Sequence, residues 1–326
     1  MSSPVFAKLL VIFLVVAAGW LVARLRLLGP GDVARTLSNA AFYVFVPALL
    51  FRTTVRIDFA ALGGRTQLGF FVPTLALLGV VYLFARLRGV GHAPGRAAWP
   101  SVLAITGVFG NSVQIGIPLA AALFGEEGLG IHVSILSLHA LILLTTLTAI
   151  VELDLARERR RDDPGHARLW HLVFATARNT VVHPVVLPVL AGLAFNAIGA
   201  VLPTVADEFL LLLGQAVVPL CLVLIGVSMA QYGVRGAVRG ALVVSSVKLI
   251  VQPLLVLAVA HAGFGLRGLP LAVVVMMAAL PVGSNALVFA QRYQAMQAET
   301  STAIVVSTLA FVVTAPLWLA VLRAVG

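Results

Sequence analysis

Two short segments of the chain place helix-breaking residues beside polar side chains in the middle of long apolar stretches. They span residues 107–118 and 279–285. Proline removes a backbone donor and clashes with the preceding helical turn, whereas glycine permits the dihedral angles of an unwound chain. The candidate binding residues in these two segments are Asn111, Ser112, Gln114, Pro118, Pro281, Gly283, Ser284 and Asn285.

The chemistry that such breaks offer is anion binding. Each break creates a helix amino terminus whose N–H groups and dipole attract negative charge. The amides of Asn111 and Asn285 add donors, and Ser112, Gln114 and Ser284 can orient substrate or water. The same amide oxygens and exposed carbonyls can also hold a sodium ion. The alternative is a pair of packing kinks in which the asparagines cap the helix ends, and two such clusters in one chain disfavour it.

Three further ionisable side chains fall inside apolar stretches. Lys248 can attract an anionic substrate or carry a proton, or it can stabilise the fold along a cavity wall, and both interpretations stay open. His139 and His183 can relay protons near neutral pH, although a lone helical histidine more often bonds a neighbour. No Asp or Glu falls in the middle of an apolar stretch, so a carboxylate-based proton pump is not expected. The sequence predicts no metal site and no cofactor.

The composition sets where these residues must lie. Of the 326 residues, 61% are hydrophobic and 10% are charged, against roughly 45–50% and 25% in soluble domains. The chain is therefore predicted to be an integral membrane protein without room for a soluble catalytic domain. Its net charge of +10 comes from arginines in short loops, so no nucleic-acid partner is predicted. A single cysteine, Cys221, excludes an intramolecular disulfide and a multi-cysteine metal or iron–sulfur site.

Apolar stretches bounded by charged residues predict ten membrane-spanning helices. With the amino terminus outside, fifteen arginines fall inside and five outside, so both termini are predicted to be outside. Trp20, Trp99, Trp170 and Trp318 fall near span ends and are expected to anchor at the membrane interface. The predicted spans are residues 4–23, 34–54, 66–86, 98–124, 127–152, 171–196, 203–231, 236–260, 268–292 and 299–324.

The chain divides into two halves of five spans. An offset of 172 residues carries the first five spans onto the last five and places Pro47 on Pro219. Because five is odd, the halves have opposite topology, an arrangement typical of secondary transporters. We predict a first repeat at 1–153, a charged cytoplasmic linker at 154–170 and an inverted second repeat at 171–326. The fold class is all-α integral membrane, with helices four and nine broken and meeting at the centre.

Several motifs resemble the auxin efflux carrier family, which includes plant PIN-type carriers and bacterial malonate or malate permease-like proteins. They are Gly110-Asn111, Gly116-Ile117-Pro118-Leu119, Leu280-Pro281-Val282-Gly283-Ser284-Asn285 and Ala290-Gln291-Arg292-Tyr293. The resemblance covers essentially the whole chain. It implies ten helices in two inverted repeats, helices four and nine crossing at their breaks, organic-anion transport and a homodimer.

Residue by residue, Asn111, Pro118, Pro281 and Asn285 match the crossover positions that contact substrate in this family, and the resemblance includes a basic residue at Lys248. The chain lacks the long central loop of the plant carriers. It therefore looks like a bacterial protein of the inner membrane, with the lipid bilayer around it.

These observations predict a secondary carrier of small organic anions, namely mono- or dicarboxylates or auxin-like acids. Alternating access would come from an elevator-type movement of a core bundle against a scaffold. The alternative is a sodium-coupled transporter like the bile-acid symporters, which use an acidic residue where this chain offers Asn285 and Gln291. The coupling ion, H⁺ or Na⁺, stays open.

Two other classes find less support. An intramembrane enzyme is not expected, because the chain has no Gly-x-Ser-x-Gly elbow, no His-Glu-x-x-His site and no paired mid-membrane aspartates. A sensor or a channel would keep the fold and lose coupled turnover.

Overall fold

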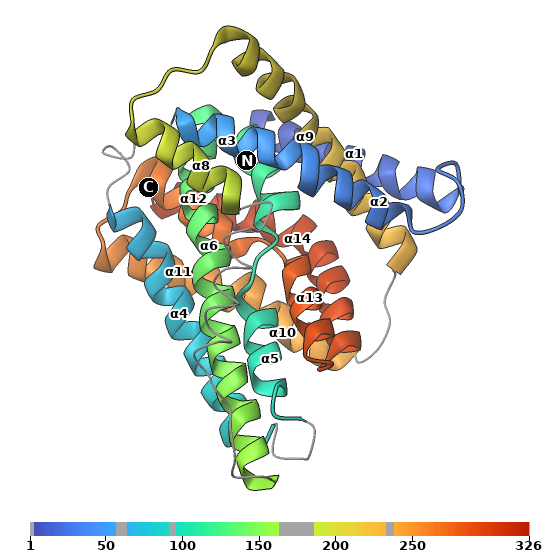
Figure 1. Cartoon of the computed structure of the whole chain (residues 1–326), viewed down its shortest axis with the longest axis vertical. Coiled ribbons are helices and arrows are strands. Elements are labelled where there is room, and N and C mark those ends of the chain that lie inside the picture. The colour runs from blue at the N-terminus through green and yellow to red at the C-terminus, as the bar shows by residue number, and fades with distance from the viewer. Residues whose placement is uncertain (1–2, 57–63, 91–95, 163–185, 233–237, 326) are drawn as a thin grey trace.

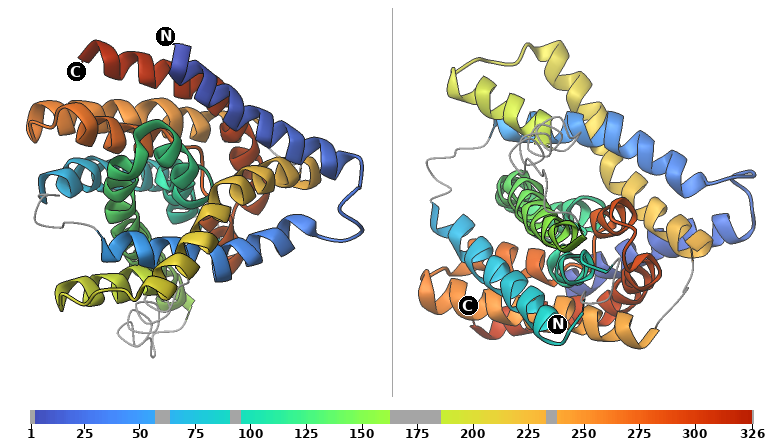
Figure 2. Two further views of the ribbon diagram at one scale, coloured as in Figure 1. Left: turned by 90° about the horizontal axis from the view of Figure 1, so that it is seen from above. Right: turned by 60° about the horizontal axis from the view of Figure 1, so that its bottom comes forward.

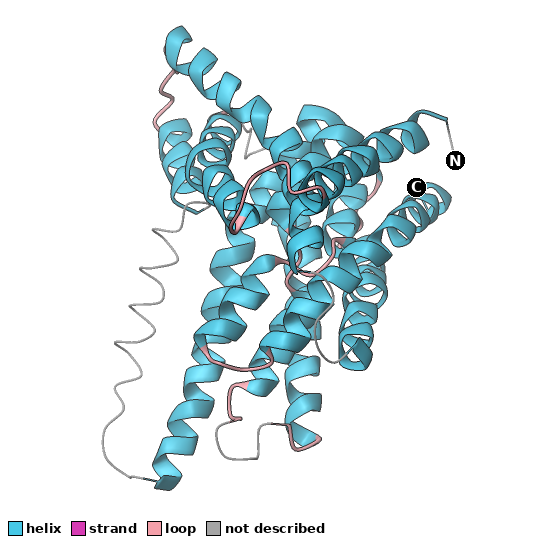
Figure 3. Ribbon diagram, turned by 90° about the vertical axis from the view of Figure 1, so that its right-hand side faces the viewer, coloured by secondary structure: helices cyan, strands magenta, loops and turns pink. Residues whose placement is uncertain are grey.

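The computed structural model describes residues 3–56, 64–90, 96–162, 186–232 and 238–325. These residues form helices joined by short loops, and their one isolated β-bridge joins Gly110 to Val282 (Figure 3). The chain is a multi-pass membrane protein with an all-helical fold in its described part. Six helical stretches are long and apolar enough to cross a membrane: Val33–Val55, Gly64–Leu87, Ser112–His139, Thr204–Gln231, Val238–Gly263 and Gln297–Val325.

The helices follow the order of the predicted apolar stretches (Figure 1). Four short π-helical turns, η1 to η4, interrupt them. The helices and turns are α1 (Ser3–Arg24), α2 (Val33–Ala40), η1 (Ala41–Phe45), α3 (Val46–Val55), α4 (Gly64–Leu87), α5 (Trp99–Val108), η2 (Ser112–Gly116), α6 (Ile117–Asp162), α8 (Val186–Ala197), α9 (Thr204–Tyr232), α10 (Val238–Ser246), η3 (Val247–Val251), α11 (Gln252–Ala258), η4 (Val259–Gly263), α12 (Gly268–Ala279), α13 (Ser284–Arg292) and α14 (Gln297–Val325).

Helix α6 contains a sharp kink. Gly125 adopts φ +68° and ψ −159°, a conformation that is open to glycine and strained for other residues. The kink falls between the stretches predicted as spans four and five. The helix then continues to Asp162, past the predicted end at residue 152 and into the predicted linker. The remainder of that linker, the first part of predicted span six and His183 lie outside the described residues.

Three of the four π-turns stand directly before a proline-containing helix start. Pro47, Pro118 and Pro253 are each the second residue after such a turn. A proline inside a helix removes one hydrogen bond and clashes with the carbonyl four residues earlier. We attribute the wider π-turn to this clash, because the turn moves that carbonyl away from the ring.

The helices sort into two groups by their contacts (Figures 1 and 2). The first helix group consists of α1, α2, α3, α8 and α9, which gather in the upper part of Figure 1. The second helix group consists of α4, α5, α6 and α10 to α14. The principal contacts between the groups are made by α6 and η2, which touch α1, α3, α8 and α9. The two groups therefore share a narrow helical interface.

Glycines let helices of the first group approach closely. A Cβ atom on Gly226 of α9 would lie 2.0 Å from the carbonyl oxygen of Val16 in α1. A Cβ atom on Gly19 would lie 2.3 Å from the carbonyl oxygen of Val223. In the same way, a Cβ atom on Gly192 of α8 would lie 2.9 Å from a main-chain oxygen of α3. Such small-residue contacts are typical of helices packed in lipid.

The expectation that Trp318 anchors at the membrane interface is wrong. Its side chain is buried, and its indole Nε1 donates a hydrogen bond to the carbonyl oxygen of Leu249 at 2.8 Å. Leu249 lies in η3, where the regular helical hydrogen bonding is interrupted. Trp318 therefore satisfies a main-chain acceptor inside the protein, a role that its position near a span end does not reveal.

Candidate functional site

The two broken segments meet as a main-chain crossing. Gly110 and Val282 form an antiparallel bridge. The N–H of Asn111 donates to the carbonyl oxygen of Pro281 at 2.8 Å, and the N–H of Gly283 donates to that of Phe109 at 2.8 Å. The prediction that the two breaks meet is therefore confirmed, and main-chain groups make the contact.

The crossing leaves no room for a side chain at Gly283. A Cβ atom there would lie 2.7 Å from the carbonyl oxygen of Gly110 and 3.1 Å from the backbone nitrogen of Asn111. At Gly110 the nearest atoms are farther away, with Leu280 Cβ and Lys248 Nζ both at 3.4 Å. Glycine is thus required at 283 by the close approach of two backbones.

Asn111 caps the helix that follows the first break. Its side-chain Oδ1 accepts from the backbone N–H of Gln114 at 3.1 Å, and its Nδ2 donates to Oε1 of Gln114 at 3.1 Å. Ser112 Oγ donates to the carbonyl oxygen of Gly110 at 3.2 Å. Asn111 therefore has the capping role that the sequence left open. A ligand that bonds its amide oxygen or displaces Gln114 must break the hydrogen bonds between Asn111 and Gln114.

The second break places its candidate residues at the start of α13. Pro281 and Gly283 belong to the crossing itself, and Asn285 follows as a half-buried residue in the first turn of α13. Ser284 begins that helix; its side chain lies outside the described atoms. Pro118 is buried in the first turn of α6, beyond η2.

Two side chains that sequence reasoning missed satisfy backbone groups freed by the breaks. His132 Nε2 lies 2.9 Å from the carbonyl oxygen of Ser112, and its ring fills the space beside Gly116, where a Cβ atom would lie 2.6 Å from the ring. Ser307 Oγ accepts from the N–H of Val282 at 3.0 Å. The sequence signal for either role is a polar residue within a mostly apolar helix, and other polar residues of α6 and α14 share it.

Lys248 reaches the crossing, and His139 stands beside it. Lys248 is fully buried, and its Nζ donates to the carbonyl oxygen of Ala278 at 2.5 Å. His139 is also buried, with its ring centroid 4.5 Å from that of Phe109. His139 Nδ1 has no hydrogen-bond partner among the described residues. Both predicted basic residues thus flank the crossing.

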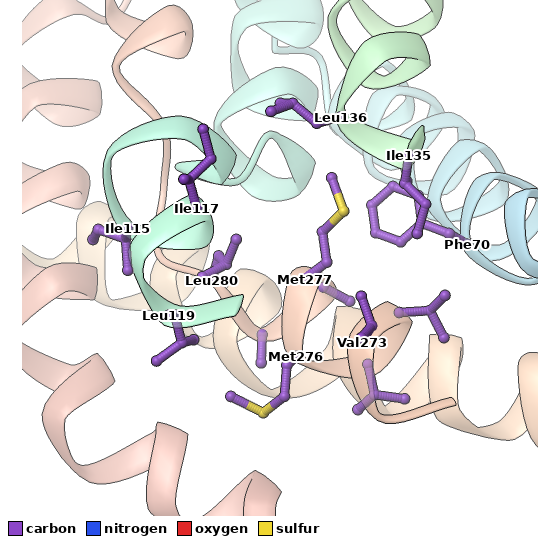
Figure 4. Close-up of a cluster of buried hydrophobic side chains, with 14 of the residues drawn as sticks. Phe70, Ile115, Ile117, Leu119, Ile135, Leu136, Val273, Met276, Met277 and Leu280 are labelled. Atoms are coloured by element: carbon purple, nitrogen blue, oxygen red, sulfur yellow. The ribbon is translucent and has the colours of Figure 1, made fainter. Parts of the chain in front are cut away.

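Apolar side chains enclose this part of the protein (Figure 4). They come from α12, from η2 and the start of α6, and from the second part of α6 and α4. Hydrogen bonds inside such surroundings are stronger than in water, because the local dielectric constant is low. The buried side chains of this cluster that Figure 4 labels are Phe70, Ile115, Ile117, Leu119, Ile135, Leu136, Val273, Met276, Met277 and Leu280.

Two cavities lie between the helix groups. One, of about 530 Å³, is lined by α3 and α9 on one side and by α4, α6 and α12 on the other, and it includes Arg52, Arg56 and Gln215. Asp207 pairs with both arginines, at 2.9 Å from Arg52 and 2.6 Å from Arg56. The other cavity, of about 480 Å³, is apolar and reaches Ile115 of η2 from between α1, α9 and α14.

A comparison with protein families decides what kind of membrane protein carries this crossing. The family described as "Membrane transport protein" matches residues 4–319. The chain belongs to this family. The family resemblance drawn from the motifs is thereby confirmed, and this family member is a transporter.

Two relatives of this transporter match it over almost their full length. One, from Methanothermobacter thermautotrophicus, is named "Uncharacterized transporter" and is 27% identical over 318 residues, covering 95% of this chain and 96% of the relative. The other, from Rhizobium meliloti, is named "Putative malonate transporter" and is 25% identical over 300 residues, covering 91% of this chain and 89% of the relative.

Proposed function

We propose that this membrane transport protein is a secondary carrier of small organic anions, either mono- or dicarboxylates or auxin-like acids. The observation that carries the proposal is the crossing, because two helix starts, η2 at Ser112 and α13 at Ser284, stand next to the same bridge. Helix amino termini attract carboxylates without a charged side chain. The proposed substrate-binding residues are Asn111, Ser112, Gln114, Pro118, Pro281, Gly283, Ser284 and Asn285.

The name of one relative supports the anion class. The Rhizobium meliloti protein is named for malonate, a dicarboxylate. Two facing helix starts suit a molecule with two carboxylates, and one of them suits a monocarboxylate. We therefore place malonate and similar short acids first among the substrates to test.

The proposed architecture is ten spans in two inverted repeats, and the crossing supports it. The offset of 172 residues places Phe109 on Pro281, Gly110 on Val282 and Asn111 on Gly283. The offset therefore carries the bond from the Asn111 N–H to Pro281 onto the bond from the Gly283 N–H to Phe109, so the two crossing hydrogen bonds occupy equivalent positions in the two halves. A pseudo-two-fold axis through the bridge would produce this pattern.

Packing in the first helix group supports the same symmetry. The offset places Phe51 on Val223. Phe51 lies where α3 contacts α8, and Val223 lies where α9 contacts α1. Each helix group also takes equivalent parts of the two halves: α1 to α3 with α8 and α9, and α4 to α6 with α10 to α14. Both relations are expected if two similar five-helix units are intertwined.

The proposed topology places both termini outside the bacterial inner membrane and the linker inside. Arg52, Arg56, Glu126 and Glu127, all expected outside, line one cavity. Thr66, at the start of α4, lines the same cavity. Arg86, which is expected inside, lies at the other end of α4 and pairs with Asp154. The two charged clusters thus sit at opposite ends of a membrane-length helix. A homodimer in the lipid bilayer remains an expectation from the resemblance.

The proposed movement is alternating access between the two helix groups. The 530 Å³ cavity lies between them, so a displacement of one group against the other would change its shape. Lys248 and His139 are the buried basic groups proposed to attract the anion or to handle a coupling proton.

Asn111→Asp gives a sharp test, because aspartate keeps the oxygen that caps Gln114 N–H and adds a negative charge at the proposed anion site. We expect the variant to fold with a lower melting temperature, because the Nδ2 bond to Gln114 Oε1 is lost, and to lose uptake of malonate, malate or succinate into proteoliposomes. Asn285→Ala should likewise lose transport. The matched control is Asn39→Asp on the exposed face of α2, which should transport normally. Near-normal transport by both site variants would refute the site.

Stabilisation by ligands identifies the substrate class. A ligand that binds the folded state raises its melting temperature according to concentration and affinity. The panel comprises malonate, malate, succinate, indole-3-acetate, taurocholate and neutral amides, each in sodium and in potassium. A carboxylate shift that is absent in Asn111→Asp supports the anion carrier. A taurocholate shift that requires sodium would favour the bile-acid-symporter alternative.

A further inference from the structure

The carbonyl end of α12 is the feature of the crossing that the anion site leaves unexplained. Helix α12 ends at Ala279 in the middle of the protein, and its residues from Val273 onward are buried. The last carbonyls of a helix have no partner within it and carry partial negative charge. In secondary transporters, such half-helix ends and unwound carbonyls hold the coupling cation.

In this chain a side chain supplies a cation at that end. Lys248 Nζ donates to the carbonyl oxygen of Ala278 at 2.5 Å, and it also lies 3.4 Å from the place where a Cβ atom of Gly110 would stand. The ammonium group therefore touches the α12 end and the first break together. Among the described residues, ion pairs join Arg52, Arg56 and Arg86 to aspartates, and none includes Lys248. A helix end thus takes the place of a carboxylate counterion.

A further buried oxygen that lacks a donor in the described part of the chain follows Lys248 along the same span. Gln252, one helical turn after Lys248, is 1% exposed, and its Oε1 has no hydrogen-bond partner among the described residues. Its Nε2 donates to Thr74 Oγ1 at 3.4 Å. Buried oxygens without donors are the ligands that a sodium ion or an ammonium group seeks. The π-turn η3 carries Lys248, and Trp318 bonds a carbonyl of this same turn.

We propose that Lys248 is a tethered cation that occupies the coupling-ion position at the carbonyl end of α12, so that the carrier has no sodium requirement. The charge moves with the protein instead of being bound and released. Removing it should leave a vacant position at the Ala278 carbonyl, which a sodium ion can then fill. The meaning of this inference rests on the proposed carrier function, whereas its test requires neither substrate nor transport.

The test measures melting temperatures of the purified full-length protein without substrate, in sodium chloride and in choline chloride at equal ionic strength and pH. The test variants are Lys248→Met and Lys248→Gln. The controls are Lys248→Arg, which keeps the charge, and Lys8→Met, which removes the other lysine. We expect both uncharged variants to melt lower than the wild type in choline. Sodium at about ten times its dissociation constant should raise their melting temperatures by roughly 3–6 °C. The wild type and the controls should melt equally in both salts.

Two results would overturn the proposal. One is a sodium-specific rise in the wild type, because the position should already be filled. The other is the absence of a sodium-specific rise in both Lys248→Met and Lys248→Gln, including failure of both to fold in either salt. Failure of the carrier function would appear separately, as a wild type that responds to no carboxylate in the ligand panel.

Discussion

The crossing can be tested at Gly283, where the structure has no space for a methyl group. In Gly283→Ala the new Cβ atom would lie 2.7 Å from the carbonyl oxygen of Gly110 and 2.9 Å from its carbonyl carbon. These are main-chain atoms of the bridge residue itself, so they cannot rotate away as a flexible side chain would. The two segments must separate, and we expect both crossing hydrogen bonds to be lost.

The expected cost follows from those two bonds. Losing both bonds leaves at least the two buried N–H donors without partners, at about 1–3 kcal/mol each, so the expected cost is at least about 2–6 kcal/mol. One kcal/mol corresponds to roughly 2–4 °C in chains of 150–250 residues. The melting temperature of Gly283→Ala should therefore fall by between roughly 4 and 24 °C, and carboxylate stabilisation should disappear.

Two other glycines serve as graded controls for this measurement. In Gly110→Ala the nearest atoms are Leu280 Cβ and the flexible end of Lys248, both at 3.4 Å, so the effect should be much smaller. Gly79 in α4 has nothing within 4 Å of an added Cβ atom, and Gly79→Ala should melt at or above the wild-type temperature. The reasoning fails if Gly283→Ala melts within about 1 °C of Gly79→Ala and keeps its carboxylate response.

Three further outcomes are expected. In Gly116→Ala the new Cβ atom would lie 2.6 Å from the His132 ring and 2.8 Å from Leu280 Cδ1, so the change should destabilise the wild type more than the His132→Ala variant, in which only Leu280 obstructs it; a double-mutant cycle should give a coupling of about 0.5–3 kcal/mol, and additivity would contradict the histidine contact. Thr53 and Gly130 lie on opposite walls of the 530 Å³ cavity. When both are replaced by cysteine in a cysteine-free background, cross-linking the pair should stop transport and reduction should restore it. Unaltered transport in the cross-linked protein would exclude closure of this cavity. Trp318→Phe should lower stability by about 1–2 kcal/mol, since a buried main-chain carbonyl loses its donor, and an unchanged melting temperature would show that water replaces the indole.

The breaks could be located from sequence because their causes are local. Glycine and proline act on the backbone within one turn, so the breaks at residues 107–118 and 279–285 can be recognised from the residue types inside apolar stretches. The kink at Gly125 likewise falls where Phe124-Gly125 ends an apolar run. The offset of 172 residues then placed position 111 on position 283, and those two residues do stand on either side of the bridge.

The partners of the freed backbone could not be found in the same way. His132, Ser307 and Lys248 reach the crossing from α6, α14 and η3, which are distant in sequence. In buried helices that are apolar on every face, periodicity does not indicate which face a polar residue takes. The π-turns were missed for another reason: a proline inside an apolar run predicts a disturbance, but the choice between a kink and a wider turn depends on packing.

The location of the crossing within one helix group constrains how a carrier of this kind can work. Both breaks, the histidine and serine that support them, and Lys248 belong to the second helix group, so every hydrogen bond described at the crossing lies within that group. The two cavities, in contrast, lie between the groups. A displacement of the second group against the first would therefore carry the proposed site intact and change chiefly the contacts of α6 and η2 with α1, α3, α8 and α9. An elevator-type movement satisfies this condition, whereas a mechanism that opens the crossing itself would have to break buried main-chain bonds in every cycle.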